Sequence, residues 1–132
     1  MKPVNQTNTT KERGDCQRAS VATLFDLELE QVPNFILYEN ELGWSVLCSF
    51  VWALGYELIE WREDEDFEAT KDGCLLASIK SDYGSRFSHQ VVINTKGVIV
   101  HDPLPNNPNN GRDVVKDGIL DDWYRIVKRG EK

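Results

Sequence analysis

One cysteine stands where a helix is expected to begin. Gly14 and Asp15 precede Cys16, and small and apolar residues at helical spacing follow it. A helix N-terminus presents unpaired backbone N–H groups and about half a positive charge, and both stabilise a thiolate. The thiolate is the nucleophilic form of a cysteine, and the same N–H groups can stabilise an oxyanion formed after attack on a carbonyl. Cys16 is therefore the candidate nucleophile. Its alternative role is that of a small apolar residue packed inside a helix.

The candidate base comes from a predicted hairpin. The chain has two histidines, and a nucleophilic cysteine usually needs one of them as its base. Residues 89–94 and 98–102 are typical of two strands joined by a tight turn, with His89 opening the first strand and His101 near the end of the second. The turn decides which histidine faces the rest of the site.

The length of that turn sets the pairing of the two strands. A two-residue loop at Thr95-Lys96 puts His89 directly opposite Asp102, on the same face of the hairpin. A loop at Lys96-Gly97 makes His89 and Asp102 diagonal neighbours on that face. A three-residue loop would reverse the faces and put His101 beside His89. We expect a two-residue loop, and so His89 as the base with Asp102 as its partner.

An aspartate beside a histidine has a defined chemical role. Asp102 can accept the Nδ1–H of the imidazole, fix its tautomer and stabilise the imidazolium. The alternative for Asp102 is an Asx turn leading into Pro103. We expect His101 to be a structural histidine, and Cys48 and Cys74 to be buried and inert.

The elements that must position these residues follow from periodicity. A helix is expected from Cys16 to about Asp26 with Asp15 as its N-cap, and another from about Glu39 to Leu54 with Gly55 just beyond its end. The predicted strands are 56–61, 74–79, 89–94, 98–102 and 123–128. An acidic connector at 62–72, a turn at 82–85 and a surface loop at 103–111 join them. Helices first and strands afterwards predict an α+β fold with an antiparallel sheet.

Composition narrows the class of protein. The 132 residues fit one domain, 1–132, and carry a net charge of −7. The pI is about 4.8, which argues against nucleic acid or an anionic membrane as a partner. The start of the chain lacks the apolar stretch of a signal peptide, and no apolar run is long enough to span a membrane. We therefore expect a cytoplasmic protein.

Cysteine usage argues against both disulfides and metals. The three cysteines are odd in number and widely spaced, so a disulfide framework is not expected. Cys16, Cys74, His89 and His101 could in principle converge on zinc, but zinc ligands usually come in closely spaced pairs. We expect no metal and no cofactor.

Two motifs resemble a known family. Residues 14–27, Gly-Asp-Cys-Gln-Arg-Ala-Ser-Val-Ala-Thr-Leu-Phe-Asp-Leu, followed by Val-Pro-Asn-Phe at 32–35, resemble the opening of small papain-like proteins related to the peptidase C39 group, which are frequent in bacteria and phages. Their later motif resembles His-Gln-Val-Val at 89–92 and Val-His-Asp-Pro-Leu-Pro at 100–105. The resemblance covers most of the chain, except its acidic middle.

The resemblance implies a papain-like fold, with helices carrying the cysteine and an antiparallel sheet carrying the other groups. It implies a Cys-His-Asp triad in that chain order, which maps onto Cys16, His89 and Asp102. It also implies an oxyanion-hole glutamine upstream of the cysteine. Gln6 is the only glutamine ahead of Cys16, at a spacing somewhat longer than usual. Its alternative is a solvated residue in a loose N-terminal arm.

Three functions are open at this point. The first is a thiol hydrolase, a cysteine peptidase or amidase, acting on a peptide, isopeptide or other amide bond of a peptide or protein substrate. The second is a deamidase or acyl or glutamyl transferase that uses the same triad. The third is a non-catalytic binding or inhibitory module on a papain-like fold, with its tryptophans and tyrosines as interface anchors. Leader-peptide cleavage is not expected, because the chain has no ATPase motif.

Overall fold

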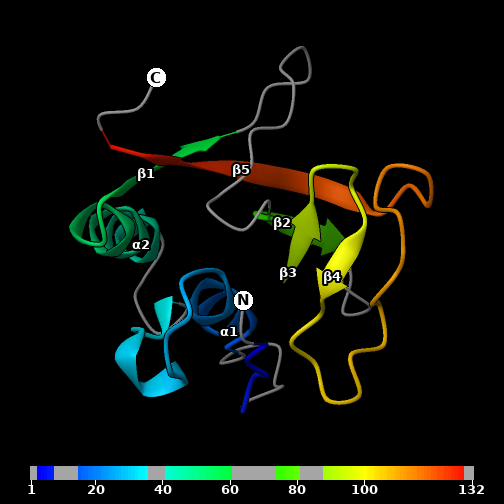
Figure 1. The fold of residues 1–132 in the computed structure, drawn as a ribbon, viewed down its shortest axis with the longest axis horizontal. Helices are drawn as coiled ribbons and strands as arrows, with labels where there is room; N and C mark the ends of the chain where they lie inside the picture. The colour runs from blue at the N-terminus through cyan, green and yellow to red at the C-terminus, as the bar shows by residue number, and fades with distance from the viewer. Residues whose placement is uncertain (1–2, 8–14, 36–40, 61–73, 81–87, 130–132) are drawn as a thin grey trace.

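The fold is an antiparallel sheet with helices packed on one face (Figure 1). The computed structural model describes residues 3–7, 15–35, 41–60, 74–80 and 88–129. These form two α-helices, α1 (Cys16–Leu24) and α2 (Glu41–Ala53), and a short 3-10 helix at Leu29–Gln31. The strands are β1 (Tyr56–Glu60), β2 (Cys74–Lys80), β3 (Ser88–Asn94), β4 (Ile99–His101) and β5 (Leu120–Lys128).

The sheet has the strand order β1-β5-β2-β3-β4, and every neighbouring pair is antiparallel. The last strand along the chain, β5, lies between β1 and β2, pairing Tyr56 with Lys128 on one side and Leu76 with Tyr124 on the other. The segment between β4 and β5 must therefore cross the sheet, and it begins immediately after the His101-Asp102 pair.

Strand β2 is buried on both sides, because apolar side chains cover both faces of the sheet. Alternate residues of β2 belong to different clusters: Leu76 packs with the helices, and Leu75 and Ile79 pack on the opposite face. The helix-side cluster joins α1, α2 and the sheet through Val21, Ala22, Leu24, Val32, Phe35, Leu47, Val51, Cys74, Leu76, Val92 and Ile126. Val114, from the β4–β5 connection, closes the other face over β2 and β3.

Helix α1 packs closely on β2 and β3. Ala19 and Ala22 are fully buried, and such small side chains allow the helix and sheet backbones to approach. Ser20 fixes the contact, since its Oγ donates a hydrogen bond to the Gln90 carbonyl at 3.1 Å. This bond holds the middle of α1 against the first half of β3.

The predicted α+β class with an antiparallel sheet is confirmed. Helix α1 ends at Leu24 rather than at about Asp26, α2 ends at Ala53 rather than at Leu54, and β5 begins at Leu120 rather than at 123. Gly55 follows α2 with a φ of 95°, as expected just beyond a helix end. The 103–111 segment is made of turns, as predicted, although Pro103 within it is buried. The acidic segment 62–72 and the turn at 82–85 lie outside the described residues.

Across the described ranges, no helix has the length and apolar character needed to cross a membrane.

Candidate functional site

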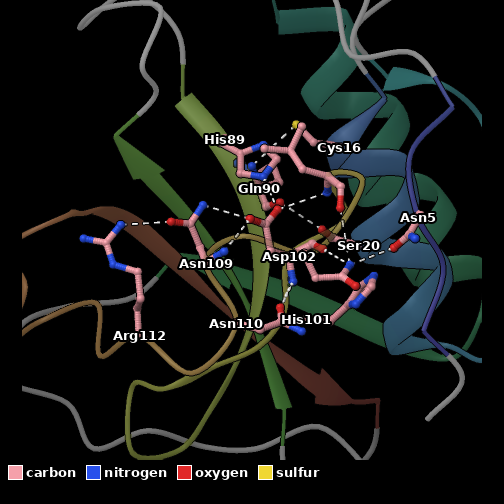
Figure 2. Close-up of polar contacts among 12 residues, drawn as sticks. Asn5, Cys16, Ser20, His89, Gln90, His101, Asp102, Asn109, Asn110 and Arg112 are labelled. Carbon is pink, nitrogen blue, oxygen red and sulfur yellow. Dashed lines mark hydrogen bonds and ion pairs between the residues drawn. The ribbon is translucent and has the colours of Figure 1, made fainter.

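Three element ends meet at one corner of the molecule: the start of α1, the start of β3 and the end of β4. They bring Cys16, His89 and Asp102 together, although the first and the last are 86 positions apart in the sequence. Figure 2 shows the imidazole of His89 between the Cys16 side chain and Asp102. The three predicted triad residues are therefore neighbours.

Cys16 is the first residue of α1 and is partly exposed. The backbone N–H of Gln90 donates to its Sγ at 3.5 Å. The first N–H groups of a helix have no intrahelical acceptor, so the N–H of Cys16 itself is a candidate donor to a developing oxyanion beside the sulfur. Both features suit a sulfur that carries negative charge.

The prediction for the side chain of Asp15 is wrong. It occupies the N-cap position but makes no capping bond to the first turn. Its carboxylate accepts hydrogen bonds from the Thr7 N–H at 3.0 Å and from the Thr7 hydroxyl at 2.8 Å. Asp15, the residue before Cys16, thus ties the N-terminal arm to the start of α1.

His89 and Asp102 make a short contact between a ring nitrogen and a carboxylate oxygen. Nε2 of His89 lies 2.6 Å from Oδ1 of Asp102. The sequence predicted Nδ1 for this contact, and the structure corrects it. Because Nε2 faces the carboxylate, Nδ1 is the ring nitrogen left for the sulfur of Cys16.

The hairpin reaches this pairing by an unexpected route. The turn between Asn94 and Val98 has three residues, 95–97, with Gly97 in the left-handed region at a φ of 82°. Ile93 therefore pairs with Ile99, and that register alone would have brought His101 to the face of His89. A bulge then shifts the ladder.

The bulge restores the predicted face. Val92 pairs with His101 rather than with Val100, so one extra residue lies in β4. This is the register expected from a two-residue Lys96-Gly97 loop, in which His89 and Asp102 are diagonal neighbours. The predicted loop is wrong, but the shared face is right.

Asp102 is fully buried and held from several sides. Oδ1 accepts from the Leu104 N–H at 3.0 Å, and Oδ2 accepts from the backbone N–H and side-chain Nδ2 of Asn109 at 3.1 and 2.8 Å. Burial by itself would raise the pKa of Asp102, but the hydrogen bonds from His89, Leu104 and Asn109 and the charge of His89 lower it on balance. The carboxyl is therefore ionised at neutral pH.

His89 has the opposite electrostatics. Burial disfavours its charged form, but hydrogen bonds to Asp102 and Cys16, together with the negative charges of both groups, outweigh burial and raise the pKa of His89 from 6.5 to about 9. At neutral pH the folded protein therefore holds His89 as an imidazolium. A positive ring between a sulfur and a carboxylate is the arrangement that stabilises a thiolate.

Gln6 lies on an arm that runs beside the site. Its exposed fraction is 8%, and its N–H donates to the Pro103 carbonyl at 2.8 Å. The next residue, Thr7, binds Asp15. Gln6 is therefore not the solvated residue of a loose arm, and its flanking contacts join the residue after Asp102 to the residue before Cys16.

The remaining candidates have structural surroundings. His101 is buried, and its Nε2 donates to the Val4 carbonyl at 2.7 Å. Cys74 is buried in the helix-side core, as expected, whereas Cys48 is only partly buried, although burial still raises the pKa of its thiol. Among the residues that the structure describes, no group of three or more His, Cys, Asp or Glu side chains could hold a metal ion.

Sequence reasoning missed the residues around the triad. Asn109, Asn110, Gln90 and Ser20 all hydrogen-bond to a triad residue or to its neighbour. The Asn-rich composition of 106–110 was a signal, since asparagines close behind an aspartate can fold back on it, but it also fits any surface turn.

Comparisons with known proteins leave the site to be judged on its own geometry. Neither the models of known protein families, nor the curated proteins, nor the solved structures include a match to this chain.

Proposed function

We propose that this protein is a thiol hydrolase of papain-like fold that acts on an amide bond of a peptide or protein substrate. The observation that carries the proposal is the position of His89, between the partly exposed Cys16 and the buried carboxylate of Asp102. The chain order Cys-His-Asp and a helix packed on an antiparallel sheet support the papain-like assignment.

The first half-reaction uses the charged pair. The thiolate of Cys16 attacks the carbonyl carbon of the substrate and forms the S–C bond, and the carbonyl electron pair moves to oxygen. The N–H of Cys16 and the side-chain amide of Gln6 are the groups proposed to bind that oxyanion. The His89 imidazolium then gives its proton to the leaving nitrogen as the C–N bond breaks, which leaves an acyl-enzyme and a neutral imidazole.

The second half-reaction restores the enzyme. Neutral His89 takes a proton from water while the hydroxide oxygen attacks the thioester, and the S–C bond breaks to return thiolate and imidazolium. Asp102 holds the ring through Nε2 in both steps and stabilises its positive charge. Because the pKa of His89 is about 9, the form that protonates the leaving group is present below that pH, and amide turnover is expected to fall as pH rises through it.

The test is alkylation of the three cysteines by iodoacetamide, read residue by residue by mass spectrometry across pH. A cysteine thiol of ordinary acidity is only about one per cent thiolate near pH 6.5. Rapid labelling of Cys16 at that pH is expected in the wild type, and His89→Ala is expected to slow it about a hundredfold. Labelling of Cys16 that is slow at low pH and indifferent to His89→Ala would contradict the proposal.

The chain supplies its own controls for this experiment. Cys74 is buried and Cys48 partly buried, so both should label slowly in the folded protein and be unaffected by His89→Ala. Equal acceleration of all three cysteines in the variant would report unfolding rather than loss of the base.

The kind of product identifies which amide bond is cleaved and which molecule accepts the acyl group. Incubation with peptide mixtures should give two shorter chains if water completes peptide-bond cleavage. An intact chain in which a glutamine has become glutamate would assign a deamidase, and a product joined to an added amine would assign a transferase. Cys16→Ala is expected to abolish whichever product forms.

A further inference from the structure

A loop residue outside the triad makes a double contact with its carboxylate. Asn109 donates from its backbone N–H and from its side-chain Nδ2, and both bonds end on Oδ2 of Asp102, at 3.1 and 2.8 Å. The other oxygen, Oδ1, faces His89 at 2.6 Å. Two donors on Oδ2 fix the rotation of the carboxylate, so Oδ1 stays aimed at the imidazole.

The amide of Asn109 has its own orienting partner. An asparagine amide can turn over and exchange its oxygen with its nitrogen, and the reversed amide would place oxygen against the carboxylate of Asp102. Arg112 prevents this, because its guanidinium donates to Oδ1 of Asn109 at 2.9 Å. Only the observed orientation lets the amide accept from Arg112 and donate to Asp102 at once. Figure 2 shows this line of contacts from Arg112 through Asn109 to Asp102.

Arg112 is in turn held at the surface. Its Nε lies 3.1 Å from the Asp117 carboxylate, and both side chains are around two-fifths exposed, at 43% and 39%. A pair this exposed contributes little to stability. Because Arg112 and Asp117 lie at the surface, each can be substituted without disturbing the packing of the buried core.

From this chain of contacts we propose that Asn109 is a positioning residue for the triad, acting through Asp102 on His89, and that Arg112 sets the direction of its amide. Only the expected effect on Cys16 reactivity rests on the proposed hydrolase function. The geometric part concerns His89 and can be tested without a substrate.

The experiment follows the two histidines of the chain by NMR titration of labelled imidazoles, with His89→Ala assigning the signals. Asn109→Ala is expected to lower the pKa of His89 relative to the wild type, because the carboxylate that supports the imidazolium loses its fixed direction. Cys16 alkylation near neutral pH is expected to slow about tenfold, the value of one hydrogen bond to a charged group. Arg112→Gln is expected to act in the same direction with a smaller effect.

A double-variant cycle separates positioning from general damage to the loop. In an Asp102→Asn background, Asn109→Ala should leave the His89 titration and the alkylation rate unchanged, because its route to His89 has been removed. Asp117→Asn is the matched control: it changes the exposed partner of Arg112 but leaves the Arg112–Asn109 contact possible, and it should titrate like the wild type.

The outcomes divide cleanly. A lower His89 pKa in Asn109→Ala that disappears in the Asp102→Asn background supports the proposal, even if wild-type Cys16 turns out to be unreactive and the hydrolase function fails. An unchanged His89 titration in Asn109→Ala overturns it, even if Cys16 is highly reactive and the hydrolase function stands. Equal effects of Asn109→Ala in both backgrounds also overturn it.

Discussion

The two histidines sit on the same hairpin, and their surroundings differ in one decisive way. His89 directs Nε2 to a carboxylate, Asp102, whereas His101 directs Nε2 to a backbone carbonyl, that of Val4. A carboxylate has a negative charge to share with an imidazolium, but a carbonyl only accepts a hydrogen bond. The same side chain therefore has a charged partner at one position and holds the N-terminal arm at the other.

Burial alone does not explain the difference between the two histidines. His101 is the more enclosed of the two, with 3% of the residue exposed against 12% of the His89 side chain. What distinguishes His89 is a charged partner on one ring nitrogen and the sulfur of Cys16 on the other side. Two predictions can break this contrast, and they differ in what they change.

The larger effect is expected from Asp102→Asn. The substitution keeps the size of the side chain but removes the charge that supports the imidazolium. The new NH2 group also faces N–H donors that had bound the carboxylate. The pKa of His89 is expected to fall below its wild-type value, and Cys16 alkylation near neutral pH to slow by about tenfold or more. NMR titration and cysteine-resolved mass spectrometry measure the two effects.

A control keeps that result from being a folding artefact. Far-ultraviolet circular dichroism and the urea midpoint of Asp102→Asn should show a folded protein under the labelling conditions. If the folded variant alkylates Cys16 at the wild-type rate, the carboxylate is not needed to support His89, and the contrast between the histidines is lost.

The smaller effect on reactivity, but the clearer effect on stability, is expected from His101→Ala. Loss of the buried bond to Val4 and the cavity left behind should lower the free energy of unfolding by about 2–3 kcal/mol. Urea denaturation measures this loss. The alkylation rate of Cys16 in the folded variant should stay within about twofold of the wild type, because the hydrogen bond between His89 and Asp102 is unchanged.

A different result for His101→Ala would be informative. If the variant loses Cys16 reactivity as strongly as His89→Ala while remaining folded, the arm that His101 holds supports the Cys16–His89 pair as well as the proposed oxyanion site at Gln6. The assignment of His101 to a purely structural role would then be wrong.

Much of this site could be predicted from sequence because its residues are fixed by local rules. Cys16 at the start of α1 follows from helix punctuation, and the shared face of His89 and Asp102 follows from the period of a strand. The turn could not be predicted with the same security. Thr95 to Gly97 allows loops of two or three residues, and the bulge at Val100 leaves no mark in an apolar run.

The contacts around the triad depend on tertiary structure. Asp15 has the right type and position for an N-cap, yet Thr7 competes for its carboxylate with both a backbone N–H and a hydroxyl. Asn109 lies in a segment whose composition indicates only turns, and its contact with Asp102 requires the chain to fold back on itself. Which nitrogen of His89 meets Asp102 depends on the approach of the sulfur from α1.

Titration of the His89 imidazole in the wild type and in Cys16→Ala shows whether Cys16 and His89 form a charged pair. If the pair is charged, the pKa of His89 is about 9 in the wild type and lower in Cys16→Ala, since the hydrogen bond and the negative charge of the sulfur are lost. A titration of His89 near its ordinary value of 6.5 in both proteins would contradict the pairing and the function built on it.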